Sequence, residues 1–173
     1  MTISLILGGA RSGKSSYAER LAAQSGQPIV YIATALVRDQ GIAERVAVHR
    51  KSRPVQWVTV ECPLQLGSAL EEHSKPGTTI LVDCLTMWVT NLLCEEDSEV
   101  KMAEEQQAFF KALNSIKGDV IFVSNEVGMG VIPMGDLTRD YVDIAGRLHQ
   151  DIAVQADNVS LIVAGLPLKL KGH

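Results

Sequence analysis

The sequence has few aromatic residues and no excess of positive charge. Only 5% of its 173 residues are Phe, Trp or Tyr, and the formal net charge is −4. Nucleic acids are bound through basic surfaces and stacked aromatic rings, and anionic membranes attract clusters of Lys and Arg. This composition argues against both, so we expect no nucleic-acid partner.

Cysteine is also scarce, and long apolar runs are missing. The three cysteines, Cys62, Cys84 and Cys94, are odd in number and form no C-x-x-C pair, so we expect buried, reduced thiols and no disulfide or zinc site. No apolar run approaches the roughly 20 residues of a membrane span, and Met1-Thr2-Ile3 leads into a strand pattern without a basic signal segment. We therefore expect a cytoplasmic protein with no membrane span.

What the sequence does contain is a regular alternation of strand and helix patterns. Apolar β-rich runs cover residues 3–7, 29–33, 57–60, 79–82, 120–123 and 159–163. Helical patterns cover residues 14–24, 41–51, 64–73, 85–93, 100–116 and 137–156. Several β runs are unbroken, which is typical of parallel strands covered on both faces. We predict a single α/β domain over residues 1–173, with a mostly parallel sheet flanked by helices and an edge strand at 166–171.

The last predicted helix has the clearest apolar face. Its members recur at helical spacing: Leu137, Tyr141, Ile144, Leu148, Ile152 and Ala156. Such a stripe is expected to pack against the sheet.

A phosphate-binding motif follows the first predicted strand. The pattern G-x-x-x-x-G-K-S is formed by Gly8, Gly9, Ala10, Arg11, Ser12, Gly13, Lys14 and Ser15. Its glycines allow the backbone N–H groups to point at phosphate oxygens, and the helix that follows adds the positive end of its dipole. We predict that the loop binds a nucleoside triphosphate, with Lys14 bridging the β- and γ-phosphates and Ser15 holding Mg²⁺.

Two further strands end in polar residues. Asp83 follows the run 79–82, where an acid that binds Mg²⁺ directly or through water is expected; the alternative is a cap for the helix that begins near Leu85. Asn125 and Glu126 follow the run 120–123 and precede a glycine-containing loop, which is either part of the ligand side of the sheet or an ordinary turn.

One histidine lies in a basic segment. His49 is surrounded by Arg45, Arg50, Lys51 and Arg53. A lone histidine usually has no catalytic role, but nearby cations keep an imidazole neutral and nucleophilic and also attract a triphosphate. Glu61, at the end of the run 57–60, is either a nucleotide contact or a simple strand-end acid, and the residues alone do not decide.

Together these motifs resemble one enzyme family over essentially the whole chain. The resemblance rests on residues 8–15, on 45–54 with His49, on Glu61-Cys62, on 82–93 and on 125–128, with further matches at 143–147 and 156–159. The sequence is similar to the bifunctional adenosylcobinamide kinases and adenosylcobinamide-phosphate guanylyltransferases of cobalamin synthesis. The order and spacing of the motifs, more than the phosphate loop, make the resemblance specific.

The resemblance implies two reactions at one nucleotide site. ATP or GTP phosphorylates the aminopropanol hydroxyl of adenosylcobinamide, and a histidine, at the position of His49, then carries GMP from GTP to adenosylcobinamide phosphate. It also implies a RecA-like sheet and a homotrimer. The further nucleotide contacts that it implies are Thr34, Ala35, Leu36, Arg50, Lys51, Ser52 and Arg53. Glu61 and Asp83 are implied as further nucleotide or metal contacts. Two positions depart from the family pattern: Val48, where some members have a second histidine, and His149, where Asn is usual.

Two other functions fit parts of the sequence. A P-loop kinase of another small molecule would use Lys14 and Asp83 and leave His49 without a role. A GTP-dependent switch is disfavoured, because the chain has no N-K-x-D-type base-reading stretch.

Overall fold

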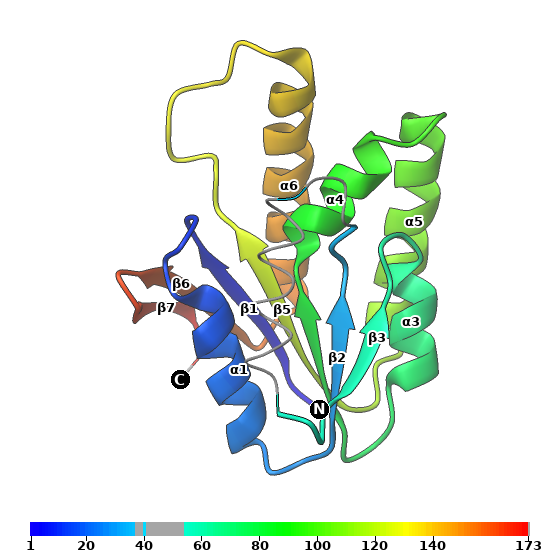
Figure 1. Ribbon diagram of the computed structural model, residues 1–173, viewed down its shortest axis with the longest axis vertical. Helices are drawn as coiled ribbons and strands as arrows, with labels where there is room; N and C mark the ends of the chain where they lie inside the picture. Colours follow the sequence, from blue (N-terminus) through cyan, green and yellow to red (C-terminus); the bar gives the residue numbers. More distant parts are fainter. Residues whose placement is uncertain (37–39, 41–53, 173) are drawn as a thin grey trace.

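The computed structural model describes residues 1–36, 40 and 54–172. Their strands form a seven-stranded sheet in the order β3-β2-β4-β5-β1-β6-β7 (Figure 1). The strands are β1 (Ile3–Gly8), β2 (Ile29–Ala33), β3 (Val58–Glu61), β4 (Thr79–Asp83), β5 (Asp119–Asn125), β6 (Asn158–Val163) and β7 (Leu166–Lys171). The pairs from β3 to β6 are parallel and β7 runs antiparallel to β6, which confirms the expected mostly parallel sheet with a C-terminal edge strand.

Helices cover both faces of the sheet. They are α1 (Lys14–Gln24), α3 (Leu66–His73), α4 (Leu85–Leu93), α5 (Ser98–Leu113) and α6 (Asp136–Gln155). The strand residues divide between two cores, one shared with α1 and the other with α3 to α6 (Figure 1). The helix expected at residues 41–51 lies outside the described residues. No helix in the described part of the chain has the length and apolar character needed to cross a membrane.

Side-chain alternation along β1 produces the two cores. Leu5 and Leu7 belong to the core under α3 to α6, whereas Ile6 belongs to the core under α1. Consecutive residues of a strand point to opposite faces, so an unbroken apolar run serves both layers at once. Two of the scarce aromatic residues, Trp88 and Phe109, meet in the larger core with ring centroids 5.3 Å apart.

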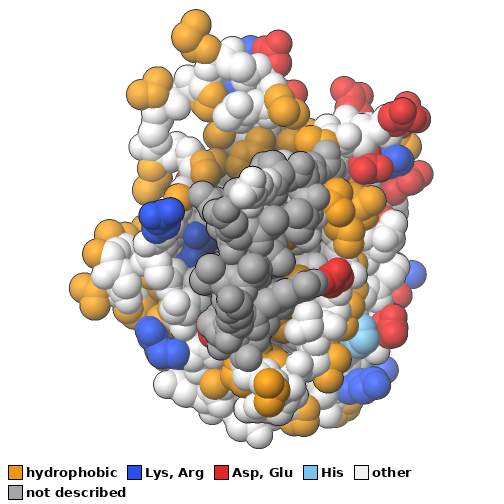
Figure 2. Space-filling view, in the orientation of Figure 1, with side chains coloured by type: hydrophobic (Ala, Val, Ile, Leu, Met, Phe, Trp, Pro, Cys, Tyr) orange, Lys and Arg blue, Asp and Glu red, His pale blue; other side chains and the backbone are white. Residues whose placement is uncertain are grey.

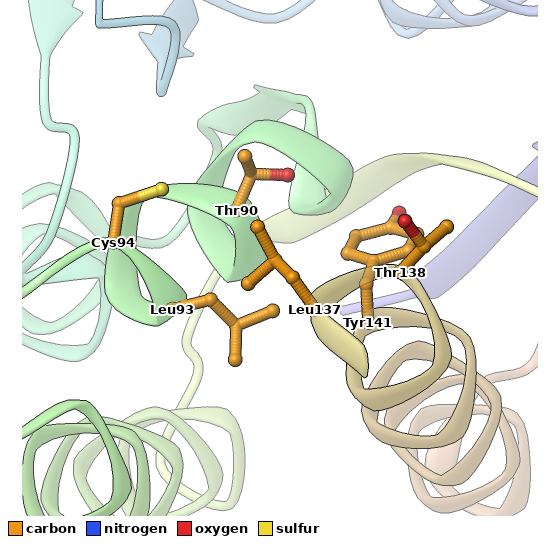
Figure 3. Close-up of a pocket in the computed structure, with 6 residues that line it drawn as sticks. All are labelled: Thr90, Leu93, Cys94, Leu137, Thr138 and Tyr141. Atoms are coloured by element: carbon orange, nitrogen blue, oxygen red, sulfur yellow. The ribbon is translucent and has the colours of Figure 1, made fainter. Parts of the chain in front are cut away.

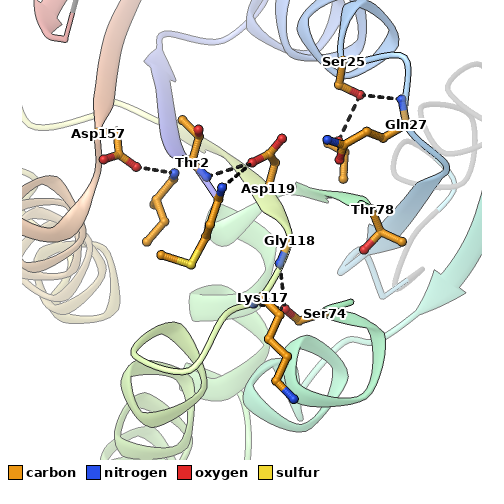
Figure 4. Close-up of polar contacts among 12 residues, drawn as sticks. Thr2, Ser25, Gln27, Ser74, Thr78, Lys117, Gly118, Asp119 and Asp157 are labelled. Carbon is orange, nitrogen blue, oxygen red and sulfur yellow. Dashed lines mark hydrogen bonds and ion pairs between the residues drawn. The ribbon is translucent and has the colours of Figure 1, made fainter. Parts of the chain in front are cut away.

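The amino-terminal edge of the sheet is closed by hydrogen bonds between chain connections (Figure 4). Asp119 Oδ1 accepts from the N–H of Thr2 at 2.8 Å, and Asp157 Oδ2 accepts from the N–H of Ile3 at 2.7 Å. The N–H of Lys117 donates to Ser74 Oγ at 2.7 Å. These side chains accept hydrogen bonds from backbone N–H groups at the strand ends, so their role is to stabilise the fold.

The apolar face of α6 extends beyond the sheet. Leu148, Ile152 and Ala156 are buried, and Ile144 is partly buried, but Leu137 is 57% exposed. The first turn of α6 lies beyond the carboxyl ends of the strands, so no strand packs against it there (Figure 1). The neighbouring helix is α4. The expected packing against the sheet therefore holds for the later part of the helix and is wrong for its first turn.

All three cysteines are free, as expected, and the thiols of Cys62 and Cys84 are buried. Cys84 as a whole residue is half-buried, whereas Cys94 is exposed, because it follows the last residue of α4 at the surface. The expectation of three buried thiols is thus wrong for Cys94.

Candidate active site

The residues predicted for the site lie in a row along the carboxyl edge of the sheet. Gly8 of β1 is opposite Asn125 of β5, and Asp83 of β4 is opposite Ala33 of β2. Ala33 is in turn opposite Glu61 of β3. The parallel register therefore brings motifs that are far apart in the sequence to one edge, which is where ligands bind in sheets of this kind.

The loop between β1 and α1 has the shape of a phosphate cradle. Gly13 has φ 94° and precedes the first turn of α1, and the N–H of Ser12 donates to the Gly9 carbonyl at 3.2 Å. Acidic residues are missing from the first turn of α1, so nothing there opposes the binding of an anion at the helix N-terminus. The half-buried Ser15 lies in this first turn.

Lys14 is held against the loop that contains it. Its Nζ donates to the Gly9 carbonyl at 3.1 Å, and the residue is buried. Burial lowers the pKa of Lys14, while the nearby Cys84 and Asp83 act in the opposite direction. A desolvated ammonium with one weak partner is well placed to exchange the carbonyl for a phosphate.

The turn of the β6–β7 hairpin supports the cradle from behind. The N–H of Gly165 donates to the Ser12 carbonyl at 2.8 Å. A Cβ on Gly13 would lie 3.1 Å from the Gly165 Cα, so both glycines allow this close approach. The loop is therefore fixed by a segment about 150 residues further along the chain.

Asp83 does not cap α4. The N-cap of that helix is Cys84, which makes no side-chain capping bond, and Asp83 Oδ2 instead accepts from the Tyr31 hydroxyl at 2.8 Å. The carboxylate is thus oriented from β2 and lies near Lys14. Burial, followed by the charge of Asp83, raises the pKa of the neighbouring Cys84 to about 11, so this thiol remains protonated at neutral pH.

The three residues after β2 differ in what they offer a ligand. Thr34 is fully buried, and its Oγ1 donates to the Cys84 carbonyl at 2.6 Å and accepts from the Cys84 N–H at 2.8 Å. Its side chain therefore holds the turn after Asp83. Ala35 is half-buried and Leu36 is exposed, so these two remain accessible at the site edge.

Glu61 is exposed at the end of β3. In the sheet register it is separated from Asp83 by Ala33, a distance of two strand spacings of about 4.8 Å each. A ligand at the phosphate loop must extend across β4 and β2 to reach it.

His149 is connected to the residues that follow β5. Its Nε2 lies 2.7 Å from Ser124 Oγ and its Nδ1 lies 3.9 Å from Glu126 Oε2. Burial lowers the pKa of His149, and the carboxylate of Glu126 acts against this change. The backbone N–H of Glu126 donates to the Gly8 carbonyl at 3.0 Å, so this group of residues adjoins the phosphate loop.

The predicted nucleophile and the basic segment cannot be placed in this site. His49, Arg50, Lys51, Ser52 and Arg53 lie outside the described residues. Among the residues that are described, no group of three or more His, Cys, Asp or Glu side chains could hold a metal ion. A magnesium ion at Ser15 and Asp83 would need phosphate oxygens and water as its other ligands.

Comparison with known proteins decides the family. The family model for "Cobinamide kinase / cobinamide phosphate guanyltransferase" matches residues 4–170. The chain belongs to this family. The family resemblance found in the sequence is thereby confirmed.

Relatives in the family match over nearly their whole length. The bifunctional adenosylcobalamin biosynthesis protein CobP of Pseudomonas aeruginosa is 51% identical over 98% of this chain and 97% of its own. The protein CobU of Salmonella typhimurium is 39% identical over 96% and 98%, respectively. Among solved structures, the RadB recombinase has a TM-score of 0.49 and 12% identity, and the match covers 92% of this chain and 73% of RadB.

Three contributors to the site were missed in the sequence. Tyr31 orients Asp83, Gly165 supports the phosphate loop, and Thr86 accepts the N–H of Asn125 at 2.7 Å. Each contacts a residue that is distant in sequence. The family motif 82–93 includes Thr86, but no local pattern singled it out.

Proposed function

We propose that this protein phosphorylates cobinamide and then guanylylates cobinamide phosphate, with both reactions at the phosphate loop. The observation that carries the proposal is the preformed cradle, with Lys14 and Asp83 beside it, in a chain that belongs to this family from residue 4 to 170. The adenosylated corrinoids are the substrates we propose, in line with the names of the relatives.

In the first reaction, the loop N–H groups and Lys14 hold the triphosphate. The hydroxyl oxygen of the aminopropanol arm forms a bond to the γ-phosphorus, the bond to the leaving diphosphate breaks, and the hydroxyl proton passes to solvent. Ser15 and Asp83 are the residues that would hold Mg²⁺, which neutralises charge on the phosphates. ATP and GTP are both suitable donors, because this step uses the phosphates and not the base.

In the second reaction, we propose that His49 is the nucleophile. An imidazole nitrogen attacks the α-phosphorus of GTP and pyrophosphate leaves. The phosphate of the acceptor then attacks the same phosphorus, and the P–N bond to His49 breaks. Neutral imidazole is a good nucleophile and, once protonated, a good leaving group, so one residue serves both halves.

The remaining parts of the proposal rest on the family resemblance. Arg50, Lys51, Ser52, Arg53 and Glu61 contact the nucleotide, as do Ala35 and Leu36. The Thr34 side chain instead shapes the site through Cys84, as its two hydrogen bonds indicate. We further propose a single domain over 1–173 that works as a cytoplasmic homotrimer.

Labelled GTP tests the two-step mechanism. Wild-type protein incubated with GTP labelled on the α-phosphate should retain label after denaturing electrophoresis, and acid should release it whereas base should not. His49→Asn should lose this label and the guanylylated product, but it should still transfer the γ-phosphate to cobinamide. His73→Asn, which changes a histidine of α3, is the matched control and should behave as wild type.

The outcomes separate the competing functions. A wild type that phosphorylates cobinamide but takes up no α-label would be a plain kinase. Label that persists in His49→Asn would place the nucleophile elsewhere.

A further inference from the structure

A pocket opens between α4 and the first turns of α6, on the carboxyl side of the sheet (Figure 3). Its volume is about 180 Å³, and its lining residues are Thr90, Leu93, Cys94, Leu137, Thr138 and Tyr141. The side chains of Leu93 and Leu137 approach each other from the two helices (Figure 3). The pocket thus has apolar walls with hydroxyl groups among them, as ligand sites usually have.

The Tyr141 hydroxyl at this pocket is buried without a hydrogen bond. The Thr86 side chain is close enough to lower its pKa, yet no described residue makes a hydrogen bond of normal distance and angle with it. Burial is the main cause that raises its pKa to about 12, so the group is a protonated donor at any working pH. A buried donor without an acceptor destabilises the protein, and a ligand that supplies the acceptor would remove this cost.

Tyr141 also connects the pocket to the catalytic edge. Thr86, beside it, accepts a hydrogen bond from the N–H of Asn125, and Asn125 is opposite Gly8 in the sheet register. Cys84 and Glu126 both influence the pKa of the Tyr141 hydroxyl, so both residues are nearby. A molecule in the pocket is therefore next to the strand ends where the phosphate loop begins.

The loop between β5 and α6 adds exposed apolar side chains near the pocket. Val131 is 95% exposed and Met134 is 94% exposed, and Met129 and Ile132 are also largely exposed. Hydrophobic side chains are visible on the loop that rises above the sheet edge (Figure 2). Monomeric proteins seldom leave such a group uncovered, and Met side chains adapt to flat, irregular ligands.

We propose that the pocket and the 129–134 loop bind the corrinoid acceptor, with Tyr141 donating a hydrogen bond to one of its amide oxygens. The proposal rests on the proposed function, because that function supplies a large acceptor. A pocket of about 180 Å³ holds one edge or side arm of a corrin, and the loop covers an apolar face of the ring. The phosphate loop and the pocket then bind donor and acceptor on two sides of the same strand ends.

The test measures cobinamide binding separately from turnover. Equilibrium dialysis gives the Kd for cobinamide in the presence of a non-hydrolysable ATP analogue, and kinase assays give KM for cobinamide and for ATP. The variants are Tyr141→Phe and Leu137→Gln. Val154→Gln is the matched control, because Val154 is an exposed apolar residue of the same helix about 25 Å further along its axis.

Both variants should raise Kd and KM for cobinamide about fivefold, while KM for ATP stays within about twofold of wild type. Tyr141→Phe should leave Tm unchanged or raise it, because it removes a donor that has no partner among the described residues. A residue with a merely structural role would lower Tm and leave Kd alone.

Unchanged Kd in both variants would overturn the proposal. The proposal would also fail if Kd rose only in variants whose oligomer size, measured by light scattering, differed from wild type. The surface would then be an interface between copies of the chain. If wild type binds cobinamide with variant-sensitive Kd but does not phosphorylate it, the proposed function fails and the pocket assignment stands.

Discussion

The carboxyl edge of the sheet has two sides that differ in how completely they are formed. On the donor side, Lys14 and Ser12 are engaged by Gly9, and the Gly165 turn holds the loop from behind. On the side proposed for the acceptor, no described residue forms a hydrogen bond with the Tyr141 hydroxyl, and Val131 and Met134 are almost fully exposed. The donor side is thus ready for a ligand, and the acceptor side still has groups that only a ligand or another molecule would cover.

The chemistry of the two proposed ligands accounts for this difference. Phosphate groups are small and highly charged, so the loop must present fixed N–H groups and an ammonium in advance. A corrin is large, flat and bordered by amides, so broad apolar contact and a few hydrogen bonds are sufficient. The donor side therefore gains from rigidity, and the acceptor side tolerates exposure in the free protein.

The largest effect is expected on the donor side, from Lys14→Ala. Without the ammonium the β- and γ-phosphates lose their main positive partner, and both reactions should fall about 10²- to 10³-fold or more. The fold should persist, because burial of this charge opposes stability. Rates of both reactions and Tm should be measured beside Lys117→Ala, an exposed lysine at the other edge of the sheet.

A normal phosphorylation rate in Lys14→Ala would show that the donor is bound elsewhere. A large fall in Tm would mean that the amine is needed for folding.

A smaller effect is expected from the support behind the loop. Gly165 has φ 79°, so Gly165→Ala should cost about 1–2 kcal/mol of stability and shift the turn that holds the Ser12 carbonyl. KM for ATP should rise about threefold to tenfold, and Kd for cobinamide should not change. Gly77→Ala is the control, because Gly77 has φ 75° and open space around it, as Gly165 has.

The control should lose similar stability and keep the wild-type KM for ATP. If both variants changed KM for ATP equally, the effect would come from lost stability alone, and the donor side would not depend on the hairpin.

Local patterns predicted the fold and the donor side well. The unbroken apolar run of β1, followed by three glycines and Lys14, specifies strand, loop and helix within about a dozen residues. Parallel register then places Asp83 and Asn125 beside that loop, as their positions at strand ends predicted. Short-range signals are sufficient where sequence neighbours are also spatial neighbours.

Contacts between residues far apart in the sequence were not predictable from local patterns. The hydrogen bond from Tyr31 to Asp83 joins two strands, and the contact of Gly165 with Ser12 joins the two ends of the chain. The apolar face of α6 was seen correctly, but periodicity does not tell where a helix extends past its sheet, so Leu137 was expected to be packed. The role of His49 stays a prediction from the sequence.

The smallest effect concerns His149, which lies between the two sides. His149→Asn should remove or weaken the bond to Ser124 Oγ and cost up to about 1 kcal/mol at pH 8. Above the ordinary pKa of about 6.5 the ring is neutral in both folded and unfolded protein, so its titration has no effect on stability. Below that value the unfolded chain binds a proton more readily than the folded protein, because burial lowers the pKa of His149 despite the facing Glu126 carboxylate.

Acid should therefore destabilise the wild type through this residue, and it should do so less in His149→Asn. Urea unfolding at pH 8, 7, 6 and 5 measures the difference, with His73→Asn as a control outside the Ser124–Glu126 contacts. The stability gap between wild type and His149→Asn should narrow as the pH falls below about 6.5, because the wild type alone has the proton-uptake penalty. A gap that stays constant from pH 8 to 5 would show that His149 binds its proton equally well in both states, and its link to Ser124 would then be a packing contact with no part in pH dependence.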